Sequence, residues 1–341
     1  MSGSGSFTIE VVRGGVVESS HVIHAVVADR QGRLEAWGDR HRPTIARSAI
    51  KAVQALPLVI TGAADAFDVT VEELALACAS HSAETEHVAA VEAWLTRLGL
   101  GEDDLECGAD VPLGIEAQRS FIRSGGEPHA LLNGCSGKHA GFLTVHRHLG
   151  EPIEHYIDRD SAVQRLVTEA TQVCTGFDLS SQRPGVDGCG IPVYAVPLQN
   201  LALSMARLVD PVDLPDVYAA AAPRVTEAAR RSFWVSGTGR TEHRIEEEAT
   251  EPVLVKGGAE GMFMGALPER GLGFALKSAD GSSRGAHAAV RAVLRHFGVL
   301  PVHDDPRGEA LLNKAGIRSG EVREHLAAPL SASVDHGLTS R

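Results

Sequence analysis

A hydroxyl and an amine stand three positions apart at Ser48 and Lys51. On a helix this spacing places both side chains on one face, within reach of each other. A serine hydroxyl becomes a strong nucleophile only when an adjacent base takes its proton, and a lysine amine is that base when burial or a nearby cation lowers its pKa. The pair therefore predicts nucleophilic catalysis by Ser48. Because Ser and Lys often occur at this spacing, a solvated helix face is the alternative.

A second amine, Lys256, ends an apolar run. Residues 253–255 are Val-Leu-Val, and Gly257 and Gly258 follow the lysine, which predicts a strand whose bare backbone a substrate can approach. A lysine on such a strand accompanies Ser-x-x-Lys in serine acyl-transfer enzymes of the penicillin-recognising fold. Lys256 alone would fit an edge strand before a turn equally well. The order of the two motifs along the chain favours the catalytic interpretation.

Ser80, His81 and Ser82 interrupt a helical pattern. Side chains at such a break can point into a cleft, and a second hydroxyl there can relay a proton between a nucleophile and a base. A serine that caps the following helix is the alternative.

Residues 132–141 combine a thiol, a hydroxyl, an amine and an imidazole with several small residues. A helical pattern follows, so Cys135 and Lys138 would lie one turn apart at a helix entrance, where outward-pointing N–H groups favour a thiolate. Cys189, in a later turn-rich loop, could complete a metal corner with Asp187 as an oxygen ligand, and two thiolates suit Zn²⁺. Because lysine is a rare ligand, free cysteines in a glycine-rich packing corner are the alternative.

The elements that must position these side chains form a clear order along the chain. Residues 7–37 have the pattern of strands, and a helix is predicted from Thr44 to Ile60, with Pro57 expected to end or kink it. A capping box of Thr70 and Glu73 begins the next helix. Further helices are predicted at 88–98, 142–149, 160–174, 199–232 and 288–297, and further strands at 253–255, 262–267 and 274–277.

Strands at both ends of the chain with helices between them indicate an α/β fold: one antiparallel sheet formed from N- and C-terminal strands and packed with helices, plus a helical lobe. We expect a flexible leader at 1–6 and a single catalytic unit at 7–341. In that unit the sheet lobe would comprise about 7–45 and 250–341, and the helical lobe about 46–249.

Composition restricts the partners. The chain has 341 residues, a formal net charge of −12 and no block of Lys or Arg, so nucleic acid and anionic membrane surfaces are poor partners. No apolar run approaches the ~20 residues that a membrane helix needs. Five scattered cysteines argue against a disulfide framework and favour reduced thiols. We therefore expect a cytoplasmic protein that acts on a small molecule.

Six blocks between about Glu10 and Gly281 together resemble the asparaginase II family, the rhizobial-type class 3 L-asparaginases. In order along the chain they are Arg13-Gly14-Gly15-Val16-Val17-Glu18-Ser19, Arg47-Ser48-x-x-Lys51-x-x-Gln54-Ala55-Leu56-Pro57, Cys78-Ala79-Ser80-His81-Ser82, Asn133-x-Cys135-Ser136-Gly137-Lys138-His139, Val186-Asp187-Gly188-Cys189-Gly190-Ile191-Pro192 and Lys256-Gly257-Gly258-Ala259-Glu260-Gly261.

The resemblance implies a fold similar to serine β-lactamases and glutaminases, a homodimer, and hydrolysis of L-asparagine to aspartate and ammonia. It implies Ser48 as nucleophile with Lys51 as its close base, and Ser80 with Lys256 as a second Ser–Lys pair. By the same resemblance, a zinc ion would be held by three ligands and the substrate would be bound by three further side chains. The zinc ligands would be Cys135, Lys138 and Cys189, and the substrate-binding residues Arg47, His81 and Asp187.

Three positions depart from the family's pattern. Ala52 stands where the family usually has Pro, Gly134 where a second Asn is common, and Asp110 where His is frequent. We expect the last two to lie near the substrate, so a serine amidohydrolase for glutamine or a β-aspartyl amide is the first alternative. A non-catalytic zinc- or redox-sensing protein using Cys135 and Cys189 is the second, and it would leave both Ser–Lys arrangements without a purpose.

Overall fold

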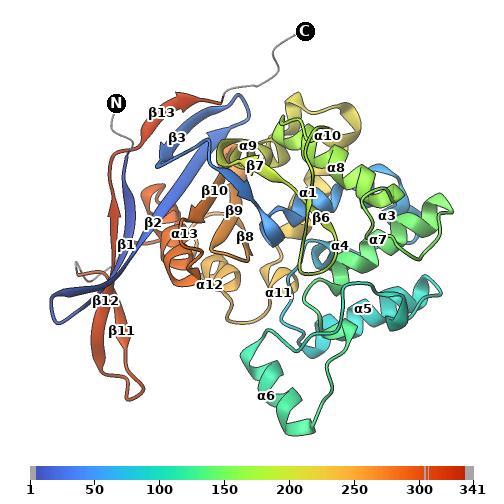
Figure 1. Ribbon diagram of the computed structural model, residues 1–341, viewed down its shortest axis with the longest axis horizontal. Coiled ribbons are helices and arrows are strands. Elements are labelled where there is room, and N and C mark those ends of the chain that lie inside the picture. Colours follow the sequence, from blue (N-terminus) through green and yellow to red (C-terminus); the bar gives the residue numbers. More distant parts are fainter. Residues whose placement is uncertain (1–4, 303–304, 306, 335–341) are drawn as a thin grey trace.

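The structure is a computed structural model that describes residues 5–302, 305 and 307–334 (Figure 1). Within these residues, nine strands form one antiparallel sheet in the order β11-β12-β1-β2-β10-β9-β8, with β3 paired to β2 and β13 paired to β3. The strands come from both ends of the chain, as predicted. They are β1 (Phe7–Arg13), β2 (Val16–Asp29), β3 (Arg33–Trp37), β8 (Leu254–Gly258), β9 (Met262–Leu267), β10 (Leu272–Ser278), β11 (Glu309–Leu312), β12 (Arg318–Leu326) and β13 (Leu330–Ser333).

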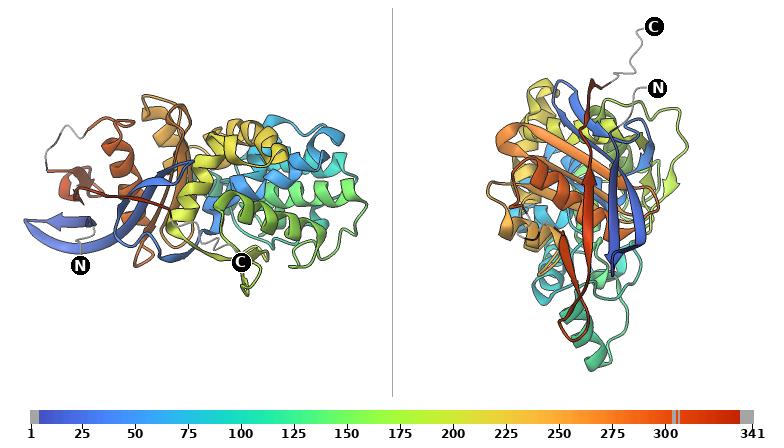
Figure 2. Two further views of the ribbon diagram at one scale, coloured as in Figure 1. Left: turned by 90° about the horizontal axis from the view of Figure 1, so that it is seen from above. Right: turned by 90° about the vertical axis from the view of Figure 1, so that its left-hand side faces the viewer.

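The long strand β2 joins two parts of this sheet. Its first half pairs with β1, with Ser19 opposite Val11, and its second half pairs with β10, with Val27 opposite Phe274. The second half is buried, whereas the first half is mostly exposed. The hairpins β1–β2 and β11–β12 therefore extend beyond the body of the molecule as an arm (Figures 1 and 2).

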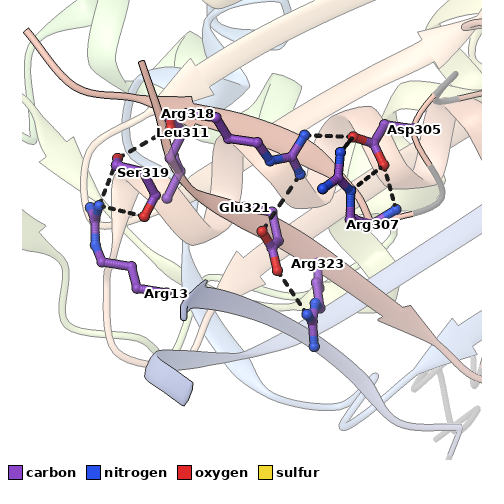
Figure 3. A network of polar contacts seen from close by, with 8 residues as sticks. All are labelled: Arg13, Asp305, Arg307, Leu311, Arg318, Ser319, Glu321 and Arg323. Atoms are coloured by element: carbon purple, nitrogen blue, oxygen red, sulfur yellow. Dashed lines mark hydrogen bonds and ion pairs between the residues drawn. The ribbon is translucent and has the colours of Figure 1, made fainter. Parts of the chain in front are cut away.

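Charged and polar side chains link the strands of the arm to one another. Asp305 accepts hydrogen bonds from Arg307 and Arg318, the latter at 2.5 Å, and Arg13 of β1 reaches Ser319 of β12 at 2.8 Å (Figure 3). Since exposed ion pairs contribute little individually, the arm depends on the network and on its backbone pairing.

Helices cover both faces of the sheet (Figure 2). Helix α13 (Ser283–His296) packs on one face, where its apolar side joins a buried cluster with Trp37 and Phe263. Helix α9 (Leu198–Val209) packs on the other face against β10, β2 and β9. The core on that side continues without a break into the helical lobe, so the two parts form one unit.

The helical lobe follows β4 (Pro43–Ile45), which pairs with β7 (Ala195–Pro197). The short β5 (Gly185–Val186) and β6 (Pro192–Val193) pair with each other inside this lobe. Its helices, with α12 beside the sheet, are η1 (Arg47–Ile50), α1 (Lys51–Gln54), α2 (Leu56–Ile60), α3 (Ala63–Ala66), α4 (Val71–Ala77), α5 (Thr85–Arg97), α6 (Ile115–Ser124), α7 (Ser136–Leu149), α8 (Ala162–Thr175), α10 (Asp216–Ala229), α11 (Ser232–Val235) and α12 (Thr241–Glu248).

Several sequence predictions are confirmed and one is wrong. The capping box forms, with Thr70 and Glu73 exchanging both hydrogen bonds, and α7 ends at Leu149, as predicted, with Gly150 as its C-cap. The continuous helix predicted from Thr44 is instead a strand followed by three short helical segments. Pro57, which lacks an N–H, lies in the first turn of α2 and so restarts a helix there.

The chain's ends also differ from expectation. The last helix begins at Ser283, five residues before the predicted start, and β11, β12 and β13 follow it. Of the predicted leader at 1–6, residues 1–4 lie outside the described residues, whereas the carbonyl of Ser6 accepts a hydrogen bond from Ala327.

No helix in the described ranges is both long and apolar enough to cross a membrane.

Candidate active site

Ser48 lies on the 3-10 turn η1, directly after a residue in an unusual conformation. Arg47 has φ of 51°, in the left-handed region. This conformation is unfavourable for a residue other than glycine, and it tends to occur at functional sites. An ion pair between Arg47 Nε and Asp187 Oδ1 at 2.6 Å secures this turn. Ser48 is half-buried, so its hydroxyl remains accessible to a small molecule.

Lys51 is completely buried one turn further on. Its ammonium donates to the carbonyl of Ala79, to Ser80 Oγ at 3.0 Å and to Cys135 Sγ at 3.1 Å. Since a lysine ammonium has three donors, all of them have partners. Ser48 is not one of these partners in the described structure, so Lys51 connects Ser80 with the sulfur of Cys135.

The Ser80 loop connects α4 to α5, as predicted from the interrupted pattern. The N–H of Ser80 donates to the carbonyl of Val235, and the N–H of His81 donates to the carbonyl of Gly134 at 3.1 Å. A Cβ on Gly134 would lie 3.0 Å from the His81 carbonyl oxygen and 2.9 Å from Leu113 Cδ1. The absence of a side chain at 134 therefore lets the two loops meet through their backbones.

His81 is fully buried. Its Nε2 is 2.8 Å from Ser136 Oγ, and its Nδ1 accepts a hydrogen bond from the N–H of Ala83. Burial, together with the nearby His87 and Lys51, keeps the pKa of His81 well below its ordinary value. In this arrangement neither ring nitrogen is free to bind a substrate, so the predicted contact of His81 with substrate has no support in the geometry.

Lys256 lies on β8, and β8 packs against the turn that carries Ser48. A Cβ on Gly258 would lie 2.8 Å from the carbonyl oxygen of Ala46, so only a glycine allows this approach. Lys256 is buried, and its Nζ donates to the carbonyl of Gly257 at 2.8 Å. Burial lowers its pKa to about 7, although the carboxylate of Glu242 acts in the opposite direction. The amine of Lys256 therefore gives up its proton more readily than an ordinary lysine does.

Glu242 was not predicted from the sequence. It is the second residue of α12, and its carboxylate lies 4.0 Å from Lys256 Nζ, with both side chains almost fully buried. One of several glutamates in a charged stretch, it carries no signal that distinguishes it before the helix is placed against β8.

The three predicted zinc ligands come together. Cys135 precedes the first turn of α7, and Lys138 on that turn donates to Cys189 Sγ at 2.9 Å. The two thiols are hydrogen-bonded, which lowers the pKa of Cys135 well below its usual value, with the ammoniums of Lys51 and Lys138 contributing. The same hydrogen bond and burial raise the pKa of Cys189. Of the two thiols, Cys135 is therefore the more acidic, and it lies beside the buried amine of Lys51.

These residues fit a zinc ion by their chemistry, since two sulfurs and an amine converge on one place. In the described part of the chain, no group of three or more His, Cys, Asp or Glu side chains could hold a metal ion. Lys138 would be the third donor in such a site, and its amine would release a proton on binding. Burial acts to lower the pKa of Lys138, but the neighbouring Cys135 and Cys189 raise it above its usual value.

Asn133 has a supporting role that the motif alone did not reveal. Its Nδ2 donates to the carbonyls of Cys107 and Gly108, and its Oδ1 accepts from the N–H of Cys135 at 2.9 Å. It therefore fixes both the sulfur-bearing turn and the loop that leads to Asp110. Asp110 pairs with His129 through its backbone, and its carboxylate accepts from Val111 N–H.

Comparison with known proteins gives a family. A family model described as L-asparaginase II matches residues 9–324, which is nearly the whole described chain. A search of curated proteins finds no match.

Solved structures provide more distant similarities. One is Mglu in its tris and glutamate form, with 18% identity and a TM-score of 0.40 over 84% of this chain and 61% of that one. The chain thus spans less than two thirds of the length of Mglu. Another is the Bacillus subtilis glutaminase YbgJ in a covalent complex with 5-oxo-L-norleucine, with 13% identity and a TM-score of 0.41 over 82% of this chain and 88% of that one.

Proposed function

We propose that this chain, which belongs to the L-asparaginase II family and is an amidohydrolase, hydrolyses the side-chain amide of L-asparagine through a covalent intermediate on Ser48. The observation that carries the proposal is that Lys51, one turn after Ser48, donates to Ser80 Oγ, while β8, which carries the buried Lys256, packs against the turn that bears Ser48. Burying two amines costs free energy, and a role in catalysis accounts for that cost.

The two lysines differ in what they can do. Lys51 has three hydrogen-bond acceptors, which hold its amine against Ser80 and Cys135. Lys256 is partly neutral near pH 7 because burial depresses its pKa, so it can accept a proton and return it. Ser80 accepts a hydrogen bond from Lys51, and its own proton can pass to a neighbouring base.

The reaction then has two halves. In the first, Ser48 Oγ attacks the amide carbon, its proton passes to a lysine amine directly or through Ser80, and backbone N–H groups near Ser48 and β8 stabilise the oxyanion. The carbon–nitrogen bond breaks, and the stored proton leaves with ammonia. In the second half, water attacks the acyl ester, which yields aspartate and restores the Ser48 hydroxyl.

A zinc ion held by Cys135, Lys138 and Cys189 would supply a positive charge that orients or polarises a substrate oxygen. Around it, Arg47 and Asp187 present opposite charges next to Ser48, 2.6 Å apart. We assign Arg47 to the α-carboxylate of the amino acid and Asp187 to its α-ammonium. Binding these groups would replace part of the ion pair between the two side chains.

Two further assignments follow the family resemblance. We place the protein in the cytoplasm as a homodimer; the five cysteines are free thiols, which fits a reducing compartment. Glutamine and β-aspartyl amides remain the alternative substrates, because one methylene changes binding by only ~1–3 kcal/mol.

Ammonia release tests the proposal. The wild type and Ser48→Ala would be supplied with L-asparagine, L-glutamine and a β-aspartyl amide, with the fold checked by circular dichroism. We expect asparagine to be hydrolysed fastest and the variant to be inactive. Equal activity of the variant would overturn Ser48 as nucleophile, and faster hydrolysis of glutamine or the β-aspartyl amide would overturn the substrate.

A further inference from the structure

A buried carboxylate lies next to one of the two active-site amines. Glu242 Oε1 accepts a hydrogen bond from the N–H of Gly257 at 3.0 Å and lies 4.0 Å from Lys256 Nζ. Both side chains are about 4% exposed. A buried charge costs several kcal/mol unless it is paired and hydrogen-bonded, so the position of Glu242 makes sense only in relation to β8 and its lysine.

The strand is built to admit this carboxylate. A Cβ on Gly257 would lie 3.0 Å from Glu242 Oε1 and 3.1 Å from the ring of Phe263, so a larger residue at 257 would displace one of them. The backbone of Gly257 therefore binds both side chains: its carbonyl accepts a hydrogen bond from Lys256 Nζ, and its N–H donates one to the Glu242 carboxylate.

The charges around Lys256 act in opposite directions. Lys51 and Arg240 favour its neutral form, whereas the carboxylate of Glu242 and, to a smaller extent, Cys135 favour the ammonium. His287 of α13 also lies near Glu242. Burial lowers the pKa of His287, although the Glu242 carboxylate acts in the opposite direction.

Glu242 itself is held ionised. Burial would raise its pKa, but Lys256, Arg240 and the N–H of Gly257 outweigh burial and keep the pKa below its usual value. A carboxylate that favours its ionised form therefore lies beside an amine whose pKa is lowered to about 7.

We propose that Glu242 is a positioning residue for Lys256: its carboxylate holds the amine in place on β8 and stabilises the ammonium that forms when the amine takes up the serine proton during amide hydrolysis. The inference rests on the proposed function. With the carboxylate present, the amine both gains and releases a proton near neutral pH. Without it, two nearby cations and burial would keep the amine neutral, and it could take up the serine proton only briefly.

The test is the pH dependence of kcat on asparagine for the wild type and Glu242→Gln. Glutamine keeps the size and the acceptor for Gly257, but removes the charge. A neighbouring opposite charge at this distance moves a pKa by about one to three units. We therefore expect the acid limb of the variant's profile to move to lower pH by that amount and kcat at neutral pH to fall about tenfold, with KM changed less than twofold.

Three variants make the result specific. Glu242→Asp keeps the charge and should restore the wild-type limb in part. Arg240→Gln removes a cation and should move the limb in the opposite direction, to higher pH, even if Glu242→Gln fails to fold. Glu247→Gln, an exposed glutamate on the same helix, should match the wild type.

The outcomes are distinct. If the wild type is active and the acid limb of its kcat profile coincides with those of Glu242→Gln and Arg240→Gln, this inference alone is overturned. The same holds if Glu242→Gln loses kcat by the same factor at every pH. A wild type that hydrolyses none of the amides would overturn the proposed function, and the inference with it.

Discussion

The ammonium of Lys51 lies 3.0 Å from the hydroxyl of Ser80 and 3.1 Å from the sulfur of Cys135. The buried amine of Lys51 thus contacts both groups of residues that the sequence indicated separately: the serines and lysines proposed for catalysis, and the predicted metal site at Cys135, Lys138 and Cys189. It follows that changes at either place should affect the other.

Replacing Lys51 by Met removes this link while keeping a similar volume. We expect kcat/KM for asparagine to fall about 10²–10⁴-fold, the range typical of groups that move a proton. Lys277→Met, on the partly exposed end of β10, is the control and should keep most of the activity. Activity of Lys51→Met within threefold of the wild type would contradict the role of Lys51.

The ion pair between Arg47 and Asp187 should contribute to stability as well as to activity. Asp187 is nearly buried and Arg47 partly so, and we expect Asp187→Asn to lower the free energy of unfolding by about 1–3 kcal/mol, because a charge-assisted hydrogen bond is lost. Asp213→Asn breaks a more exposed pair with Arg30 and should cost under about 1 kcal/mol. Urea unfolding measures both; equal effects would show that the pair does not secure the turn.

Zinc content tests the thiolate corner. Purified wild type should contain about one zinc per chain by atomic absorption, and Cys135→Ala and Cys189→Ala should each lose it. Cys174→Ala removes a buried thiol elsewhere in the core and should keep the metal. Zinc that persists in both ligand variants would show that the corner is a packing site only.

Contact between β8 and the Ser48 turn should be sensitive to one methyl group. Gly258→Ala would place its Cβ 2.8 Å from the Ala46 carbonyl, so we expect a loss of about 1–3 kcal/mol from overpacking and a marked loss of activity. Gly101→Ala meets nothing within 4 Å and should leave activity unchanged. Full activity of Gly258→Ala would mean that Lys256 and Ser48 act independently.

Local patterns predicted much of this molecule because they depend on neighbouring residues. The helix that begins after Cys135, the break at Ser80 and the strand that carries Lys256 all follow from short-range signals. The same reasoning failed between Thr44 and Ile60, where an apolar stripe suggested one helix. Tertiary contacts with β8 instead hold Arg47 in a left-handed conformation that no pattern encodes.

Features that arise between distant segments could not be predicted. The relation of Glu242 to Lys256 depends on the packing of α12 against β8, which no local sequence pattern encodes. The strands β11 and β12 lack a clear apolar alternation, because they form an arm with exposed and charged surfaces. The direction of Lys51 toward Ser80 rather than Ser48 also depends on how the loop at 78–84 folds over α1.

Covalent labelling tests the central claim, that Ser48 is the nucleophile, most directly. The protein would be incubated with a diazoketone analogue of asparagine, digested, and mapped by mass spectrometry. The account predicts one label per chain on Ser48, protection by aspartate, and no label in Ser48→Ala. A label on Ser80 or Cys135 instead, with Ser48 unmodified, would contradict it.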